Sequence, residues 1–354
     1  MRMQHLFAIA TVLISGMAFA HPPQHVTHYR IEKLRGLDGS PADINNFGTI
    51  TGEGVDANSI HKPYVWTKRD VITLDPQGPF TPVVGNSVND RGQVVGFMVV
   101  SDSSGVQRTG AFLWTRGHIE EIEGFPGGFG VIAANAVNNR GQVAGYSDSN
   151  IGNECFLWEH GSIMSLGDLP GGSTDCDALA INDFGVVVGF GRTADGFRPF
   201  LWREAEMSEL SIPPDAKNGV ASAINNFGLI LGGYTGADNT AHPVLWYRGH
   251  RLQVPLPAGF TRGGPNALND WGDMVGTAVV NDATPAVAYL WHHLEPIDLN
   301  TRIVADDPLK PCVLLNYGMG INDMGEIAIL GTDFCAGTYS TIFRLVPVRE
   351  GRGR

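Results

Sequence analysis

Short apolar segments alternate with one recurring polar turn along most of this chain. The turn reads Asn, then Asn or Asp, a variable residue and Gly, and it begins at Asn45, Asn89, Asn138, Asn182, Asn225, Asn269 and Asn322. An Asn side chain accepts hydrogen bonds from the backbone two residues on, and Gly in fourth place adopts the left-handed backbone of a type I turn with a bulge. Because apolar residues flank every copy, the pattern predicts a series of tight β-hairpins.

A second motif follows each hairpin, with an aromatic residue or Val, an apolar residue and Trp in succession. It occurs at residues 64–66, 112–114, 156–158, 200–202, 244–246 and 289–291, and the last copy substitutes Thr341-Ile342-Phe343. A ring at one strand position in every copy favours core packing between sheets over an aromatic platform for sugars or bases. A polar turn and a further apolar strand follow, so each period holds four strands. In the fourth copy these are 178–181, 186–190, 199–202 and 207–210.

The repeat length matches one class of fold. Successive turns are 43 to 53 residues apart, which is typical of a four-stranded propeller blade. The last copy supplies only three strands, and residues 28–34 precede the first turn, where a fourth strand belongs. We therefore predict an all-β, seven-bladed β-propeller over residues 28–348, closed by an N-terminal strand that completes the last blade and covers an edge.

With these motifs the chain resembles the HAF-repeat proteins of bacteria. That family is a set of predicted extracellular repeats named for a His-Ala-Phe motif before Leu-Trp. His242-Pro243-Val244-Leu245-Trp246 is the nearest match, Ala111-Phe112-Leu113-Trp114 keeps the Ala-Phe, and residues 166–172 are similar to the Gly-rich segment of the family. The resemblance implies a β-propeller-like extracellular protein and says little about function, because fold alone does not determine activity.

The chain ends predict export. Residues 1–20 combine Arg2, an apolar run and Ala18-Phe19-Ala20 before His21, which is typical of a cleaved signal peptide. The alternative, a membrane anchor, is disfavoured because the run is about 14 residues long and a spanning helix needs roughly 20. We expect a soluble, secreted protein, extracellular or periplasmic, with an N-terminal segment at 21–27 and a disordered tail at 349–354.

Charge narrows the range of partners. The formal net charge is −12, and cleavage after residue 20 leaves −13 because it removes Arg2 and no acid. Nucleic acid is excluded as a partner, since its binding requires a basic patch. A carbohydrate, a peptide or an envelope protein is the expected partner, and the protein is expected to be a monomer without a membrane span.

The two faces of a propeller disc differ in their loops. We call the side with the loops after the second and fourth strands the variable face, because these loops are long and differ between copies, and variable loops on a rigid scaffold commonly bind ligands. The opposite side, with the short turns after the first and third strands, is the turn face. One acid lies in each loop after a second strand: Asp56, Asp102, Asp148, Asp195, Asp238, Asp282 and Asp333.

This ring of acids has two interpretations. It predicts a weak site for a cation or a basic partner at the mouth of the central channel, or it reflects the preference of Asp for turns. No calcium-loop motif is present, so we expect no cofactor. Five histidines are spread over the turn face: His118, His160, His250, His292 and His293. His21, His25 and His28 lie at the predicted mature N-terminus, where a copper chelate is the alternative to a mobile polar terminus. Neither C-x-x-C nor H-E-x-x-H occurs, so we predict no metal ligands.

Four cysteines in an exported chain predict two disulfides. On the strand map, Cys155 and Cys176 lie on the variable face of the third blade, and Cys312 and Cys335 lie on that face of the seventh. The other two pairings would cross the disc, beyond the roughly 7 Å limit between Cα atoms. We predict the bridges Cys155–Cys176 and Cys312–Cys335. The alternative is four reduced cysteines packed as small apolar residues.

No catalytic residue is predicted, because the chain lacks the G-x-S-x-G nucleophile motif and no single acid stands out from the others. The favoured hypothesis is a secreted binding module that uses the variable face. The alternative is an extracellular polysaccharide hydrolase or lyase at the channel mouth, which would need two or three convergent acids or a histidine group in a pocket.

Overall fold

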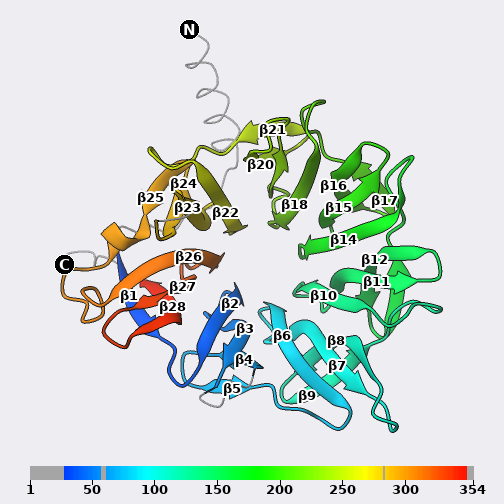
Figure 1. The fold of residues 1–354 in the computed structure, drawn as a ribbon, viewed down its shortest axis with the longest axis horizontal. Coiled ribbons are helices and arrows are strands. Elements are labelled where there is room, and N and C mark those ends of the chain that lie inside the picture. Colours follow the sequence, from blue (N-terminus) through cyan, green and yellow to red (C-terminus); the bar gives the residue numbers. More distant parts are fainter. Residues whose placement is uncertain (1–27, 57–60, 282–283, 349–354) are drawn as a thin grey trace.

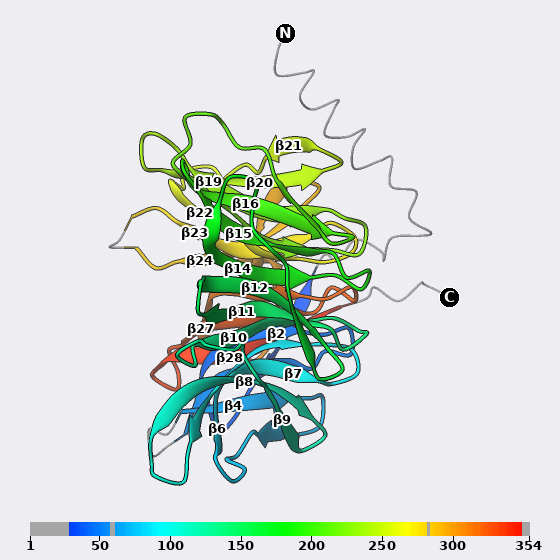
Figure 2. The same cartoon turned by 90° about the vertical axis from the view of Figure 1, so that its right-hand side faces the viewer.

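A computed structural model shows a ring of β-sheets around a central axis (Figure 1), and Figure 2 views the same ring from its edge. The structure describes residues 28–348 except 57–60 and 282–283. The predicted signal peptide, the segment 21–27, the tail 349–354 and Asp282 lie outside the described residues. In Figure 1 the first strand of each repeat lies nearest the axis, and the later strands follow outward.

Five sheets have four antiparallel strands each. Four of them consist of consecutive strands: β2 (Asp38–Ile44), β3 (Ile50–Val55), β4 (His61–Trp66) and β5 (Val71–Thr73); β6 (Phe80–Val88), β7 (Val94–Ser101), β8 (Gln107–Thr115) and β9 (His118–Ile122); β18 (Asn218–Ile224), β19 (Ile230–Thr235), β20 (Ala241–Tyr247) and β21 (His250–Gln253); β22 (Arg262–Leu268), β23 (Met274–Val279), β24 (Val287–His292) and β25 (Glu295–Asp298). The fifth unites both ends of the described chain.

That fifth sheet has the order β1-β28-β27-β26. It contains β1 (Tyr29–Lys33), β26 (Val313–Ile321), β27 (Ile327–Asp333) and β28 (Thr338–Pro347), and a short 3-10 helix, η1 (Leu299–Arg302), precedes it. β1 pairs antiparallel with β28 from Tyr29 opposite Pro347 to Lys33 opposite Phe343. Completion of the last blade by the N-terminal strand is therefore confirmed.

The remaining eight strands form one sheet. They are β10 (Ile132–Val137), β11 (Val143–Ser149), β12 (Gly152–Glu159), β13 (Ser162–Ser165), β14 (Ser173–Ile181), β15 (Val187–Thr193), β16 (Gly196–Arg203) and β17 (Glu206–Glu209). A single parallel pair, Asn153 with Asp175, joins β12 to β14. The all-β propeller with four-stranded blades is confirmed, but the prediction of seven separate blades is not, because the structure has five separate four-stranded sheets and one eight-stranded sheet. The Cys155–Cys176 bridge draws the start of β14 against β12, with the Cα atoms 5.5 Å apart.

The Asn turns have the predicted chemistry. In the fifth turn, the Asn225 side-chain oxygen accepts from the Phe227 and Leu229 backbone N–H groups at 3.1 and 2.9 Å. Its Nδ2 also donates to the Asn269 carbonyl of the next turn at 3.1 Å. The same link, 2.8 to 3.1 Å long, recurs between all successive turns and returns from the seventh to the first. Each first Asn therefore also binds its neighbouring repeat.

The motif rings form the core, as predicted. The six Trp residues of the motif are between 0 and 8% exposed, and Phe343 in the seventh copy is fully buried. Their clusters span neighbouring repeats, because Phe156 and Trp158 pack with Val95 and Leu113 of the preceding sheet. Burial between sheets therefore holds the ring together.

Substituting Ala for Gly228 is expected to lower the free energy of unfolding by about 1 kcal/mol. Gly228 has a φ of +79°, and an added Cβ would meet nothing within 4 Å, so backbone strain is the only cost. The urea midpoint of Gly228→Ala measures the effect. Gly228→Asn is the control and should lose less, since Asn tolerates the left-handed region. Equal midpoints for Gly228→Ala and the parent would contradict the turn assignment.

Candidate functional site

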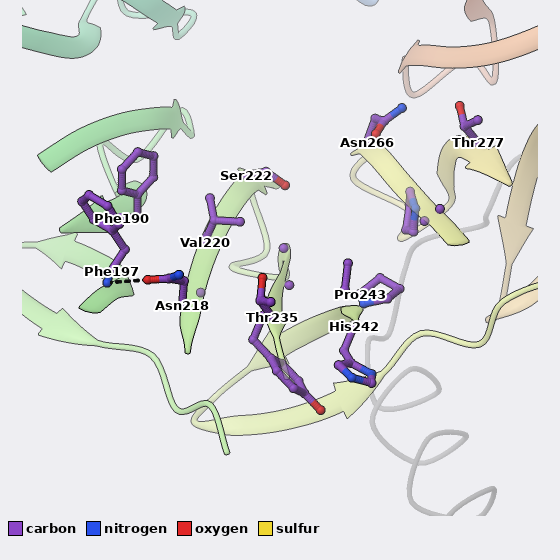
Figure 3. A pocket seen from close by; sticks show the side chains of 18 residues that line it. Phe190, Phe197, Asn218, Val220, Ser222, Thr235, His242, Pro243, Asn266 and Thr277 are labelled. Carbon is purple, nitrogen blue, oxygen red and sulfur yellow. Dashed lines mark hydrogen bonds between the residues drawn. The ribbon is translucent and has the colours of Figure 1, made fainter. Parts of the chain in front are cut away.

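A cavity of about 630 Å³ opens on the variable face, where β15 and β16, β18 to β20, and β22 and β23 meet. Asn218 at the start of β18, Thr235 at the end of β19 and Ala241 at the start of β20 line it. These strand ends carry the loops after second and fourth strands, so the cavity lies on the face predicted to bind. Figure 3 shows its side chains.

One wall is built from two phenylalanines of the hairpin β15–β16. The rings of Phe190 and Phe197 meet edge to face with centroids 5.2 Å apart. The Arg192 guanidinium lies 4.3 Å from the centroid of Phe197 and donates to Asp175 at 2.7 Å. The Phe197 backbone N–H donates to the Asn218 side chain at 3.0 Å, the dashed line in Figure 3. These contacts fix the ring of Phe197 in place.

The opposite wall contains a stacked pair from β19 and β20. Tyr234 and His242 have centroids 4.8 Å apart and planes inclined by 22°. The His242 Nε2 atom lies 2.8 Å from the Thr240 hydroxyl and 3.8 Å from the Asp238 carboxylate. The Thr240 backbone N–H also donates to this carboxylate, which lowers the pKa of Asp238 below its ordinary value. Asp238 is thus a predicted site acid that lies close to a side chain of the pocket.

Two lining residues of the cavity are small at a repeat position where other copies carry a ring. Eight residues after the turn Asn, three earlier copies carry Phe97, Tyr146 and Phe190, whereas the fifth copy has Gly233 and the sixth has Thr277. Gly233 and Thr277 both line the cavity. Our sequence reasoning missed this site, although an alignment of the copies would have revealed the missing ring.

His242 and Tyr234 are the only titratable side chains in the described lining of the cavity. It contains no Asp, Glu, Lys or Arg among the described residues, and amide and hydroxyl groups supply its polar side. Asn218, Ser222, Thr235 and Asn266 line it, and the hydroxyl of Thr277 is buried without a hydrogen-bond partner in the described structure. The site therefore suits a neutral ligand with both apolar and hydrogen-bonding surface.

Most predicted site acids have local partners. The buried carboxylate of Asp148 accepts from the backbone N–H groups of Phe129 and Val131, the latter at 2.9 Å. The carboxylate of Asp333 accepts from Lys33 at 2.7 Å. These contacts hold one loop and the closing strand, so they account for both acids structurally.

The other acids are dispersed over separate loops. Asp102 accepts from the Val106 backbone N–H at 2.9 Å in its own turn, Asp56 lies 3.6 Å from the Lys62 ammonium, and Asp195 is exposed. No three His, Cys, Asp or Glu residues of the described chain form a group that could hold a metal ion. A cation site built from the predicted ring stays a prediction.

Both predicted disulfides are confirmed. Cys155 pairs with Cys176 and Cys312 pairs with Cys335, with Cα atoms 5.5 and 5.2 Å apart. Two disulfides are typical of proteins outside the reducing cytoplasm. No helix in the described part of the chain has the length and apolarity to cross a bilayer.

Stability is expected to fall as the pH rises from about 4 through 7. Burial raises the pKa of Asp177 on β14 from 3.8 to about 7, although the Asn135 amide donates to its carboxylate at 2.7 Å. Between these pKa values the folded protein binds a proton that the unfolded chain has lost, so deprotonation favours unfolding.

Asp177→Asn is the variant that tests this pH dependence. It should raise the free energy of unfolding at pH 8 by about 2 kcal/mol. A pKa shift costs about 1.4 kcal/mol per unit when the group is deprotonated in the folded state, and partial access of solvent to Asp177 reduces this cost. At pH 4 the variant and the parent should be alike, because Asp177 is then protonated when folded. Urea titrations at both pH values measure the difference, and an equal gain at both would contradict the assignment.

Comparison with known proteins supports the fold alone. No protein-family profile matches the sequence, and no curated protein matches it. The β-propeller domain of the Trilobed protease from Pyrococcus furiosus is 8% identical over 91% of this chain and 94% of that one, with a TM-score of 0.53. A puromycin-hydrolyzing peptidase from Mycobacterium tuberculosis is 10% identical over 95% of this chain and 56% of that one, with a TM-score of 0.50.

TolB from Acinetobacter baumannii is 11% identical over 70% of this chain and 62% of that one, with a TM-score of 0.47. This chain thus spans less than two thirds of the length of TolB and of the peptidase. At such identities only the propeller architecture is shared.

Proposed function

We propose that this protein is a secreted binding module that holds a neutral carbohydrate in the cavity between Phe197 and Tyr234. The observation that carries the proposal is a cavity of about 630 Å³ with rings in its walls and amide and hydroxyl groups beside them. Sugar rings have C–H faces that pack on aromatic side chains and hydroxyl groups that hydrogen-bond to amides. The cavity offers both kinds of contact.

The composition of the lining favours binding over hydrolysis. Glycoside hydrolysis commonly requires two carboxyl groups about 5 to 10 Å apart across the scissile bond. The described lining contains one histidine and no carboxyl group. Asp238 approaches the cavity only through His242. Carbohydrate binding is therefore favoured, and hydrolysis or lysis of a polysaccharide is the alternative function.

A glycan array followed by calorimetry with the best glycan tests the proposal. Tyr234→Ala and Phe197→Ala should each weaken binding by about tenfold or more, since stacking on one ring contributes roughly 1 to 3 kcal/mol for a planar ligand. Tyr339→Ala is the matched control, because Tyr339 is 80% exposed at the start of β28 in another blade. Binding of short peptides in place of glycans, or equal losses in all three variants, would overturn the proposal.

Secretion rests on two observations. Residues 1–20 have the signal-peptide pattern, and the two disulfides fit an oxidising compartment. Mass spectrometry of the exported protein should find His21 at its N-terminus. An uncleaved chain that remains in the cytoplasm would contradict this part of the proposal.

We also propose that the chain is a seven-bladed member of the HAF-repeat group. The closed series of seven Asn-to-carbonyl hydrogen bonds supports the count. So does the single residue pair that joins the two halves of the eight-stranded sheet. The motif at His242–Trp246 supports membership, and further sequences with the same repeat would test it.

A further inference from the structure

Exposed apolar side chains gather on the turn face, opposite the carbohydrate cavity. The third residue of four Asn turns is Phe47, Phe184, Phe227 or Met324, and these side chains are 65, 72, 51 and 44% exposed. Trp271 holds the same place in the sixth turn and donates its indole N–H to the Asp323 carbonyl at 2.9 Å. We call these five residues the collar. They belong to the fourth, fifth, sixth, seventh and first turns, which are successive in the ring, so they follow one another along an arc around its centre.

Inside the collar lies a polar ring made by the second residue of each turn. In every case, its backbone N–H donates to the side chain of the next turn at 2.7 to 2.9 Å, and the seven links close on themselves. The members in order are Asn46, Asp90, Asn139, Asp183, Asn226, Asp270 and Asp323. These residues line a cavity of about 190 Å³ at the axis, which has room for one extended side chain.

Amides and carboxylates alternate around most of this ring. The Asn226 Nδ2 atom, for example, donates to Asp183 at 3.2 Å and to Asp270 at 3.0 Å. A ring of seven cannot alternate throughout, and the mismatch falls where Asp270 and Asp323 are neighbours with no amide between them. Burial raises the pKa of Asp323, and the Asp270 charge raises it further. At this one place no side-chain amide lies between two carboxylates, and only the Asp270 backbone N–H donates from one turn to the next.

The carboxylates of the ring have no cationic partner in the described chain. None of the four forms an ion pair with a described Lys or Arg. A positive side chain brought by a partner would supply both the missing side-chain donor and the missing charge. The centre of the turn face is thus complementary to a Lys or Arg side chain.

A groove lined mainly by apolar residues, with Arg203 and Arg248 also in its lining, continues the surface outward. It has a volume of about 280 Å³ and lies between β16 and β20, with Leu201, Leu210 and Trp246 among its lining residues. Ile224 lines both this groove and the central cavity, and Phe227 of the collar forms part of the groove wall. A segment that reaches the centre therefore passes apolar surface on its way.

We propose that the turn face docks a protein segment that inserts one Lys or Arg side chain among the central carboxylates and packs flanking apolar residues on the collar and in the groove. The collar argues for a polypeptide, because a metal ion or a polyamine would use the carboxylates without the apolar arc. No group of acids suited to a metal ion occurs in the described chain. This surface is separate from the proposed carbohydrate cavity, so a negative result for peptide docking would leave the proposal of carbohydrate binding unaffected, and the reverse.

Selection from a random 12-residue peptide display library on the immobilised full-length protein tests the proposal. We expect enrichment of peptides with one Lys or Arg flanked by aromatic or aliphatic residues. The best synthetic peptide should bind about tenfold or more weakly to Asp270→Asn/Asp323→Asn and to Phe184→Ser/Phe227→Ser. Replacing its cation by Gln should cost a similar factor, and Tyr339→Ser on the variable face should change nothing.

Thermal melts verify that the variants fold, and glycan binding provides a second check because it should persist in all the turn-face variants. The proposal is overturned if no peptide is enriched or if the enriched peptides lack a cation. It is also overturned if the parent and the collar variant bind the peptide equally. If calcium or spermidine at millimolar concentration displaces the peptide, and if Phe184→Ser/Phe227→Ser binds these cations as tightly as the parent does, the site belongs to a small cation instead.

Discussion

Deletion of residues 21–36 is expected to unfold the protein under conditions in which the full-length chain stays folded. The deletion removes β1, on which Tyr29 and Ile31 are 1 and 8% exposed, and it also removes Leu34, which is 1% exposed. Burial of each such side chain contributes roughly 1.5 to 3 kcal/mol. Their loss alone approaches the 5 to 15 kcal/mol of net stability that is typical of a folded protein.

Polar contacts add to the effect of this deletion. The buried guanidinium of Arg344 on β28 pairs with Glu32, and the Ile31 backbone N–H donates to the Asp307 carboxylate at 2.8 Å. Without β1, Arg344 would be left in the sheet without its carboxylate partner, which is costly for a buried charge. The outer edge of β28 would also be exposed for pairing with other chains.

Circular dichroism melts and analytical ultracentrifugation measure the outcome. The deletion variant should melt far below the full-length protein, with aggregation, whereas deletion of residues 349–354 should change little. A variant without residues 21–36 that melts like the full-length chain would show that ring closure does not stabilise the fold.

The elements predicted correctly from sequence depend on local chemistry repeated many times. Each Asn turn needs only the side chain of its own first residue and a Gly such as Gly228, so seven copies specify seven hairpins without tertiary information. The Trp position follows from the alternation of buried and exposed residues along a strand. The closing strand could be inferred because the last copy lacks its fourth strand and residues 28–34 had no other place.

The candidate sites depend on contacts between repeats, which a reading of single motifs does not provide. The cavity lies beside Gly233, which stands where three other copies have an aromatic residue. Its walls come from three neighbouring blades, so no single copy of the repeat predicts it. The two adjacent carboxylates of Asp270 and Asp323 could be predicted only if one knew that the turns close into a ring with an odd number of members. The acids of the variable face show a different limit of sequence analysis, since the sequence does not reveal that Asp148 holds a loop and Asp333 pairs with the closing strand.

Removal of the Cys155–Cys176 bridge by substituting Ala for both residues should lower the free energy of unfolding by more than the roughly 3 kcal/mol that the chain constraint contributes. The bridge spans 21 residues, and it constrains the unfolded chain accordingly. Cys155 and Cys176 are also 0 and 4% exposed and pack with Leu166 and Leu169. Loss of their sulfur atoms therefore removes core contacts in addition to the covalent constraint.

The second bridge provides the matched control. Cys312–Cys335 spans 23 residues, so the chain-entropy model gives it nearly the same stabilisation of about 3 kcal/mol. Cys335 is exposed, so we expect Cys312→Ala/Cys335→Ala to lose only the stabilisation from the chain constraint. The difference in free energy of unfolding between the two double variants then measures the packing of the buried sulfur atoms of Cys155 and Cys176. Urea denaturation gives both values, and mass spectrometry during titration with dithiothreitol should find Cys312–Cys335 reduced first. Earlier reduction of the buried bridge, or a smaller loss in the Cys155→Ala/Cys176→Ala variant than in the control, would show that burial of the first pair does not protect or stabilise it.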